Sequence, residues 1–161
     1  MMGFLRGSGG MRRWPLALAT IAAMALTAAA YTGAPADDIP SNSLIQPQEL
    51  AQALKSGQKP VVLYTGPQAF YAQAHIPGAE NIGPVSKPQG MDKLRARAAT
   101  LPKDAPVVIY CGCCPWDHCP NIRPAFAELK KLGFSKVRVL YLATSLGADW
   151  KDKGFPVASG E

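Results

Sequence analysis

The feature that most constrains the fold is an apolar run in the second half of the chain, APVVIYC, which ends at Cys111. Its valines and isoleucine favour an extended strand, and no charged residue interrupts it. A strand that is apolar at successive positions must be covered on both faces, as in a parallel sheet between two layers of helices. The run therefore predicts a central parallel strand at Val107–Tyr110.

Strand-like and helix-like segments alternate on both sides of this run. VVLY at residues 61–64 and SKVRVLYL at residues 135–142 predict two further strands, and HIPGAENI contains a short extended piece. The spacing of apolar residues and the flanking Pro and Gly predict four helices, near residues 47–57, 67–74, 91–101 and 123–133. This alternation predicts an α/β domain with a mostly parallel central sheet flanked by helices on both faces.

The first 36 residues have the pattern of a targeting segment. Arg6, Arg12 and Arg13 precede the apolar run WPLALATIAAMALTAAA, and small residues at Ala34 and Ala36 follow. A basic head, an apolar middle and an A-x-A end predict a secretory signal peptide over residues 1–36. An uncleaved membrane anchor is the alternative. We therefore expect a periplasmic or secreted protein.

The rest of the chain has the length and charge of one exported domain. Residues 37–46 are polar and are expected to form a linker, followed by a single domain over residues 47–158. The net charge of +6 falls to +3 without residues 1–36, which hold three arginines and no acidic residue. This excess is too small and too dispersed to indicate nucleic-acid binding. No later segment is apolar for long enough to span a membrane, so no stable insertion is expected after signal removal.

All four cysteines lie within nine residues, in the segment YCGCCPWDHCPNIRPAF that follows the central strand. Reactive sites of parallel α/β sheets lie at the carboxyl ends of strands, where Cys111 is expected. The loop leads into the N-terminus of the next helix, whose free N–H groups and dipole favour an anion. The pattern predicts a nucleophilic thiolate at Cys111.

The same thiols also permit redox or metal chemistry. Cys111 and Cys114 form a C-x-x-C pair, and Cys113, Cys114 or Cys119 can resolve an oxidised form of Cys111. Thiolates and imidazole bind soft ions such as copper or zinc, with Cys111, Cys114, His118 and Cys119 as candidate ligands. A soft-metal binding module and a thiol–disulfide redox protein therefore stay open beside catalysis. A thioredoxin-like fold is disfavoured, because the expected helix starts well after the C-x-x-C pair.

Four segments resemble, in order and spacing, the rhodanese-like domain, a sulfurtransferase family. AHIPGAENI resembles the family's G-H-I-P-G-A motif, and VVIYC resembles the active-site strand that ends in the nucleophilic cysteine. AFAELKKLGFSKVRVL resembles the helix, Gly-Phe turn and strand that follow, and WKDKGFPV resembles the closing W-x-x-x-G-x-P-V. The likeness runs roughly from Ser43 to Val157 and implies a rhodanese-like fold for nearly all of the mature chain.

The active-site loop departs from the family pattern. The usual loop is C-x-x-x-x-R, in which backbone N–H groups surround the cysteine sulfur. Here eleven residues separate Cys111 from Arg123, and three of them are further cysteines. The usual D-x-R after the first strand is replaced by Tyr64-Thr65-Gly66. The resemblance thus implies a variant with an extended cysteine-rich loop.

The resemblance also implies a mechanism. Cys111 would take a sulfane sulfur from thiosulfate or a similar donor and hold it as a persulfide, stabilised by N–H groups of the loop and the following helix. Arg123 would orient the anionic donor through bidentate contacts. The partners would be a small-molecule sulfur donor and an acceptor such as a protein thiol, and no cofactor would be required.

Overall fold

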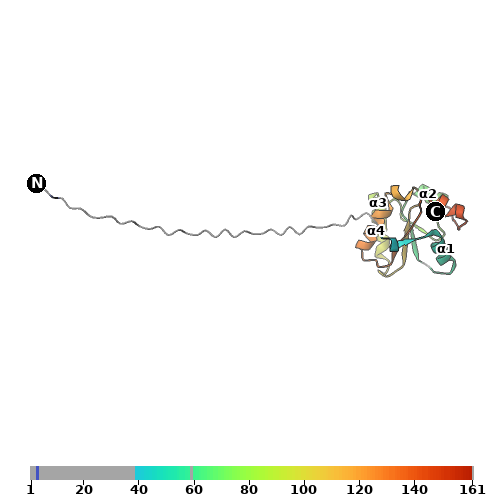
Figure 1. The fold of residues 1–161 in the computed structure, drawn as a ribbon, viewed down its shortest axis with the longest axis horizontal. Helices are drawn as coiled ribbons and strands as arrows, with labels where there is room; N and C mark the ends of the chain where they lie inside the picture. Colours follow the sequence, from blue (N-terminus) through green and yellow to red (C-terminus); the bar gives the residue numbers. More distant parts are fainter. Residues whose placement is uncertain (1–2, 4–38, 59, 161) are drawn as a thin grey trace. The chain divides into compact units, whose positions relative to one another are not determined.

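The computed structural model describes residue 3, residues 39–58 and residues 60–160 (Figure 1). Its centre is a five-stranded sheet in the order β1-β5-β4-β2-β3, with every neighbouring pair parallel. The strands are β1 (Leu44–Ile45), β2 (Val61–Tyr64), β3 (Glu80–Asn81), β4 (Val107–Tyr110) and β5 (Val137–Leu140). The expected central strand is confirmed, since β4 lies between β5 and β2 and is buried along its whole length.

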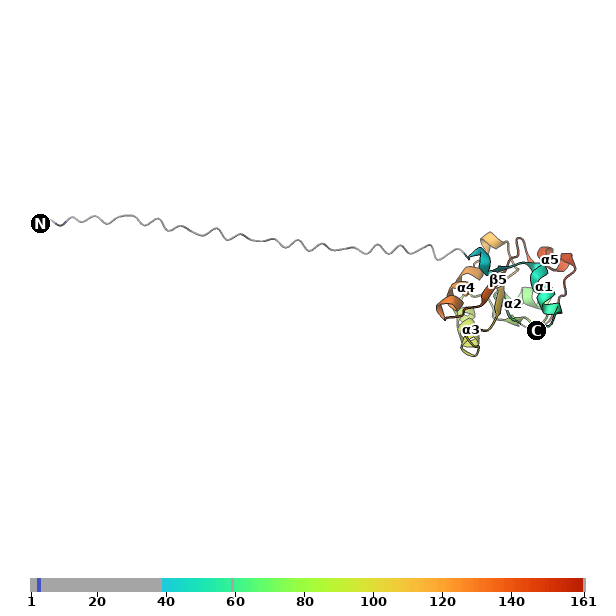
Figure 2. The same ribbon diagram turned by 60° about the horizontal axis from the view of Figure 1, so that its bottom comes forward.

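Helices cover both faces of this sheet, as Figures 1 and 2 show. They are α1 (Pro47–Lys55), α2 (Gln68–Gln73), α3 (Pro88–Ala99), α4 (Ile122–Lys131) and α5 (Leu146–Asp149). Side chains of successive strand residues point to opposite faces. Strand residues on one face, such as Leu63, Ile109 and Val139, pack with α3 and α4. Strand residues on the other face, such as Val62, Val108 and Leu140, pack with α1, α2 and α5. The expected α/β class, with helices on both faces, is therefore confirmed.

The domain begins earlier than the sequence suggested. Leu44 and Ile45 form β1 and pair with Val139 and Leu140 of β5, and Ile39 is also buried. Residues 44–46 therefore belong to the sheet domain and not to a linker. Two apolar residues among polar neighbours are too short a run to indicate a strand, so only the pairing with β5 identifies them.

Apart from residue 3, the predicted signal peptide lies outside the described residues, and it stays a prediction. Within residues 39–58 and 60–160, no helix is both long and apolar enough to cross a membrane.

Two backbone hydrogen bonds fix the cysteine-rich loop against the end of the sheet. Trp116 N donates to Ala143 O over 3.1 Å, and Leu146 N donates to Gly112 O over 3.0 Å. The Trp116 ring also packs on Tyr141, with centroids 5.0 Å apart. The long loop is thereby held on the segment between β5 and α5, and it leads from the end of β4 into α4.

Candidate functional site

Cys111 follows β4 directly, at the carboxyl end of the central strand. Its side chain is only 2% exposed, because the loop and α5 close over the strand end. Gly112 allows this closure: its φ is +75°, and a Cβ there would lie 2.8 Å from Leu146 Cβ. The chain therefore turns sharply after Cys111, and the sulfur stays at the rim of the sheet.

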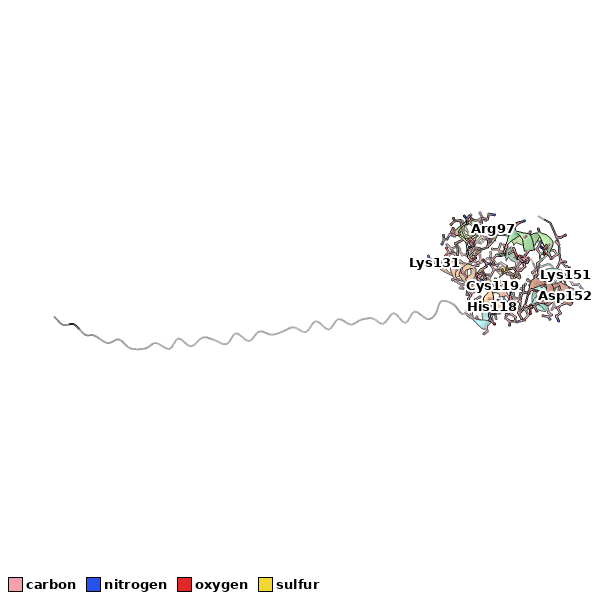
Figure 3. All side chains as sticks on the ribbon, turned by 90° about the horizontal axis from the view of Figure 1, so that it is seen from above. Arg97, His118, Cys119, Lys131, Lys151 and Asp152 are labelled. Atoms are coloured by element: carbon pink, nitrogen blue, oxygen red, sulfur yellow. The ribbon has the colours of Figure 1, made fainter. Side chains whose placement is uncertain are left out.

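The four thiols form one cluster around Cys111. Cys111 Sγ lies 3.2 Å from Cys113 Sγ, which lies 3.5 Å from Cys114 Sγ. Cys111, Cys114 and Cys119 form a second grouping, whose sulfurs all lie within 4.8 Å of one another. The sequence-predicted thiols are thus brought together, while His118 is exposed and does not belong to that three-sulfur group. Figure 3 labels Cys119 and His118 among the side chains of the domain.

Cys119 occupies the place at the helix N-terminus that was expected for Cys111. The backbone N–H groups of Asn121 and Ile122 hydrogen-bond to the Cys119 sulfur, immediately before and at the start of α4. A hydrogen bond with the Cys111 thiol is the largest cause that lowers the Cys119 pKa to about 6, against the opposing effect of burial. Among Cys111, Cys114 and Cys119, the Cys119 thiol is therefore the most readily ionised.

The pKa values of Cys111 and Cys114 are raised. A hydrogen bond with Cys119 is the main reason that the Cys111 pKa is raised, and burial adds to it. Burial raises the Cys114 pKa to about 12, with hydrogen bonding to Cys113 as the next cause. Interacting thiols titrate together, so Cys111, Cys114 and Cys119 lose their protons in coupled steps.

Asn121 supports Cys111 through its side chain. Its Nδ2 lies 3.5 Å from Cys111 Sγ, and its Oδ1 accepts from Ser86 N over 3.0 Å. Asn121 directly precedes α4, where a polar side chain often caps the helix, but its side chain makes no capping hydrogen bond. A polar residue before a helix has the same appearance in sequence whether it caps the helix or contacts a distant strand end, so the sequence held no signal for this role.

A pocket of about 310 Å³ opens next to Cys111. Its walls come from the end of β2, from α2, from the Cys111–Cys113 turn and from the start of α5. Phe70, 49% exposed, gives it an apolar side, and Lys151 is the one cationic residue among the described residues that line it. Sequence reasoning missed Lys151, because it lies forty residues beyond Cys111 and only the fold brings the two to one pocket.

A second, much smaller cavity of about 10 Å³ lies on the inner side of the cluster. It is lined by Cys111, Cys114 and Cys119 together with apolar groups, which include Ile122 and Leu142. Cys111 lines both the open pocket and this cavity, whereas Cys113 lines only the open pocket. The Cys111 sulfur therefore stands between two different environments.

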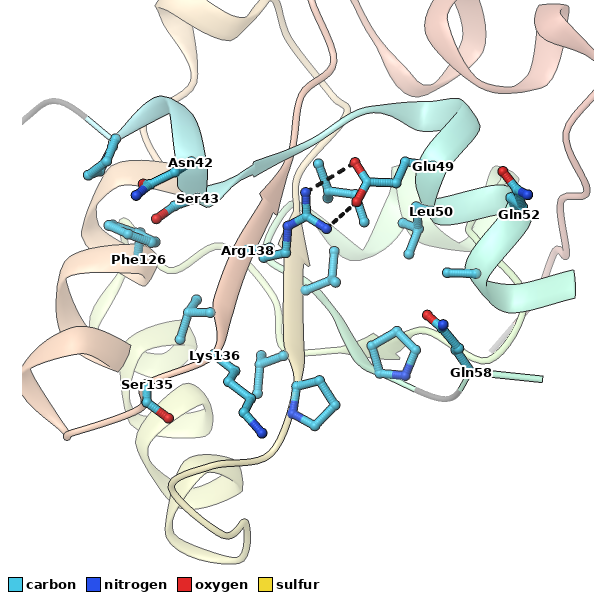
Figure 4. A pocket seen from close by; sticks show the side chains of 18 of the residues that line it. Asn42, Ser43, Glu49, Leu50, Gln52, Gln58, Phe126, Ser135, Lys136 and Arg138 are labelled. Atoms are coloured by element: carbon cyan, nitrogen blue, oxygen red, sulfur yellow. Dashed lines mark hydrogen bonds and ion pairs between the residues drawn. The ribbon is translucent and has the colours of Figure 1, made fainter. Parts of the chain in front are cut away.

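A larger hollow lies elsewhere in the domain. Figure 4 shows this pocket of about 1210 Å³, in which Arg138 of β5 meets Glu49 of α1. Arg138 also donates to Leu44 O over 2.7 Å, and its hydrogen bond lowers the Glu49 pKa. The residues that line this larger pocket include Val107 and Val137, the first residues of β4 and β5. The pocket therefore lies near the amino ends of these strands, whereas Cys111 lies at the carboxyl end of β4. It contains no thiol among the described residues, so we assign the site to the smaller pocket.

A family model described as the rhodanese-like domain matches residues 46–143, more than half of the 161-residue chain. The chain belongs to the rhodanese-like domain family. The matched part contains β4, Cys111 and the whole cysteine-rich loop, and it ends before Lys151. No curated protein sequence matches the chain significantly.

Solved rhodanese-like structures share the fold of this chain. The rhodanese-like domain of the Alr3790 protein from Anabaena sp. is 22% identical with a TM-score of 0.55, over 73% of this chain and 79% of that one. The BH2092 protein from Bacillus halodurans is 22% identical with a TM-score of 0.57, over 72% and 76%. A thiosulfate sulfurtransferase from Pseudomonas aeruginosa is 27% identical with a TM-score of 0.53, over 74% of this chain but only 20% of its own length.

In this rhodanese-like domain, Arg123 lies apart from the open pocket. Its Nη1 is 3.4 Å from Trp116 O, and its Cζ lies 5.7 Å from the centre of the Trp116 ring. Arg123 is half-buried at the start of α4 and is not among the described residues that line the Cys111 pocket. The contacts indicate that it holds the long loop against α4.

Gly66, which follows β2, leaves the space that the Cys111 sulfur occupies. A Cβ at this position would lie 2.5 Å from Tyr64 Oη and 3.0 Å from Cys111 Sγ. The Tyr64 hydroxyl donates to Pro67 O over 3.2 Å, and burial, followed by the charge of Cys111, raises its pKa. The D-x-R pattern of the family resemblance has an arginine at this position, and the buried Tyr64 and Cys111 leave no room for that side chain here.

We expect Gly66→Ala to destabilise the domain and to disturb the site. The new methyl group would press on the buried Tyr64 ring and on Cys111, and such overpacking costs roughly 1–3 kcal/mol. Urea unfolding would measure this loss. The matched control is Gly147→Ala at the same pocket, where the nearest contact would be an ordinary 3.5 Å to Ser145 Oγ. Equal stability of the two variants would contradict the close packing described for Gly66.

We also expect one thiolate of the cluster to form at unusually low pH. Ultraviolet absorbance of the reduced protein should show a thiolate step at about pH 6, because Cys119 is stabilised by hydrogen bonds. In Cys119→Ser the first step should move to about 8.5 or above, the range of an ordinary thiol. Cys113→Ser should retain the low step. A step that stays near pH 6 in Cys119→Ser would show that another sulfur carries the charge.

Proposed function

We propose that this rhodanese-like domain is a sulfurtransferase in which Cys111 carries sulfane sulfur as a persulfide. The observation that carries the proposal is the position of Cys111. It follows the central strand of a rhodanese-like sheet and lines an open pocket of about 310 Å³. The family match and the likeness to a thiosulfate sulfurtransferase support the same chemistry.

The pocket suits a small anionic sulfur donor such as thiosulfate. Lys151 supplies a positive charge at its wall, and no acidic residue is among the described residues that line it. Cys111 is nearly buried, so the donor must enter the pocket to reach the sulfur. We assign to Lys151 the donor-orienting role that the family resemblance had implied for Arg123.

The first half-reaction needs the thiolate form of Cys111. Cys111 and Cys119 titrate as a coupled pair, and the form with the proton on Cys119 and the charge on Cys111 is the less populated one, because the Cys111 pKa is raised and the Cys119 pKa is lowered. The attack draws on this minor form. The Cys111 sulfur then attacks the outer sulfur of thiosulfate. A new S–S bond forms, the S–S bond of thiosulfate breaks, and sulfite leaves with the electron pair. Cys111 is left as a persulfide anion and Cys119 as a thiol.

The second half-reaction returns the cluster to its starting state. An acceptor thiolate attacks the outer sulfur of the persulfide, and the S–S bond to Cys111 breaks. Cys111 leaves with the electron pair and recovers its proton from Cys119. The negative charge thus returns to Cys119, where the N–H groups of Asn121 and Ile122 stabilise it.

The variant Cys111→Ser should lose sulfur transfer by at least about 10³-fold, because a hydroxyl cannot form the persulfide. Transfer from thiosulfate to an added thiol measures the loss. The mass of the intact wild-type protein after thiosulfate treatment should rise by one sulfur atom, and the variant should not change. His118→Ala alters an exposed loop residue and serves as the control. Normal transfer in Cys111→Ser would remove Cys111 from the nucleophilic role.

The variant Lys151→Gln should weaken donor binding by about fivefold, since a cation a few ångströms from an anion in water contributes ~1 kcal/mol. We expect a higher KM for thiosulfate, a nearly unchanged kcat and a difference that shrinks at high salt. Lys153→Gln removes the same charge from the same turn, but Lys153 does not line the pocket. An equal rise of KM in both variants would indicate a general charge effect and contradict the assignment.

A further inference from the structure

Sulfur transfer at Cys111 leaves one feature of the cluster unexplained. The transfer step uses the open pocket, Cys111 and the proton acceptor Cys119, but Cys114 has no part in it. Cys114 Sγ nevertheless lies within 4.8 Å of both other sulfurs, on the side of the small inner cavity. Three sulfurs therefore converge on one cavity from the strand end, the middle of the loop and the start of α4.

We propose that Cys111, Cys114 and Cys119 form a binding site for one copper(I) ion. Sulfur–metal bonds in thiolate sites are about 2.3 Å long, so three sulfurs around one ion in a plane would lie about 4 Å apart. The observed limit of 4.8 Å brings the three to that separation with small side-chain movements. The cavity between them, about 10 Å³, has room for a single atom and little more.

The set of ligands selects a soft ion with low coordination number. Zinc sites in proteins are almost always four-coordinate, whereas thiolate ligands favour copper(I). Among the described residues, no fourth Cys, His, Asp or Glu belongs to the three-sulfur group. Cys113 lines only the open pocket, and His118 is exposed.

In the part of the chain that the structure describes, the rest of the cavity adds no side-chain ligand of the usual kinds. Apart from the sulfurs, the cavity is lined by Gly112, Trp116, Ile122, Leu140 and Leu142. Three thiolates without a fourth Cys, His, Asp or Glu in their described group favour copper(I) over zinc, which is almost always four-coordinate.

Copper(I) binding and sulfur transfer would exclude one another, because both use the Cys111 sulfur. Each thiol that binds the ion releases its proton to solvent. The N–H groups of Asn121 and Ile122 then help to offset the remaining negative charge at Cys119. Cys111 bound to the ion cannot attack a donor in the open pocket, so the metal would act as an inhibitor of the proposed transfer.

The test is an anaerobic titration of the reduced full chain with copper(I) in competition with a chromophoric chelator. We expect one ion per chain. Cys114→Ser and Cys119→Ser should each weaken copper(I) binding by more than about a hundredfold. This loss exceeds the one that usually follows when a residue that contacts only a metal ligand, and not the metal, is changed. Cys113→Ser and His118→Ala are the matched controls, since they remove the other thiol and the imidazole of the same loop. Both control variants should keep a copper(I) affinity within about threefold of the wild type, a much smaller change than the hundredfold loss expected when a ligand is removed.

A second measurement uses only the wild-type protein, so it does not depend on whether the variants fold. X-ray absorption at the copper edge of the wild type should show three sulfur neighbours and no nitrogen. No binding, a second ion of equal affinity, a nitrogen ligand, or an equal loss in Cys113→Ser would each overturn the proposal. Binding is measured without a sulfur donor and transfer without copper, so failure of either proposal is seen separately. If both hold, one equivalent of copper(I) should abolish transfer by the wild type.

Discussion

The hydrogen bond from the Cys111 thiol to the Cys119 sulfur is the interaction on which the site depends. It joins the end of β4 to the start of α4, the two positions where a parallel α/β sheet stabilises an anion. In a short family loop one cysteine can occupy both positions. The eleven residues between Cys111 and Arg123 separate them, and the chain places a thiol at each.

Because the two positions are separated, the Cys111 sulfur has two different sets of neighbours. On one side it contacts Cys113 and the open pocket with Lys151, and on the other it meets Cys114 and Cys119 around the inner cavity. Cys111 thus borders the open pocket and the other thiols at once. The rigid element behind it is β4, which is buried along its whole length.

The sequence was sufficient for the fold and for the position of Cys111, but not for the division of roles within the loop. β2 and β4 were predicted at their observed bounds, because continuous apolar runs bounded by Pro and Gly leave little alternative. β1 was missed because two residues carry no periodicity. Lys151 and the Asn121 contact were missed because both depend on segments far apart in the chain that the sheet brings together. The sequence analysis placed the thiolate on Cys111, facing the start of the next helix, but no sequence pattern could indicate that Cys119 would lie nearer to that helix start.

The cysteine-rich loop is long, and contacts of Trp116 and Arg123 hold it in place. Trp116 is anchored on Ala143 and packs against Tyr141, while Arg123 contacts the Trp116 carbonyl and lies over its ring. These contacts fix the middle of the loop from β5 and from α4 at once, so Cys114 and Cys119 on either side of Trp116 keep their places against Cys111. An arginine at the helix start thus supports the positions of the thiols, while the charge that faces the open pocket comes from Lys151, beyond α5. The long loop therefore goes together with an arginine that contacts Trp116 and a lysine that lines the pocket beside Cys111.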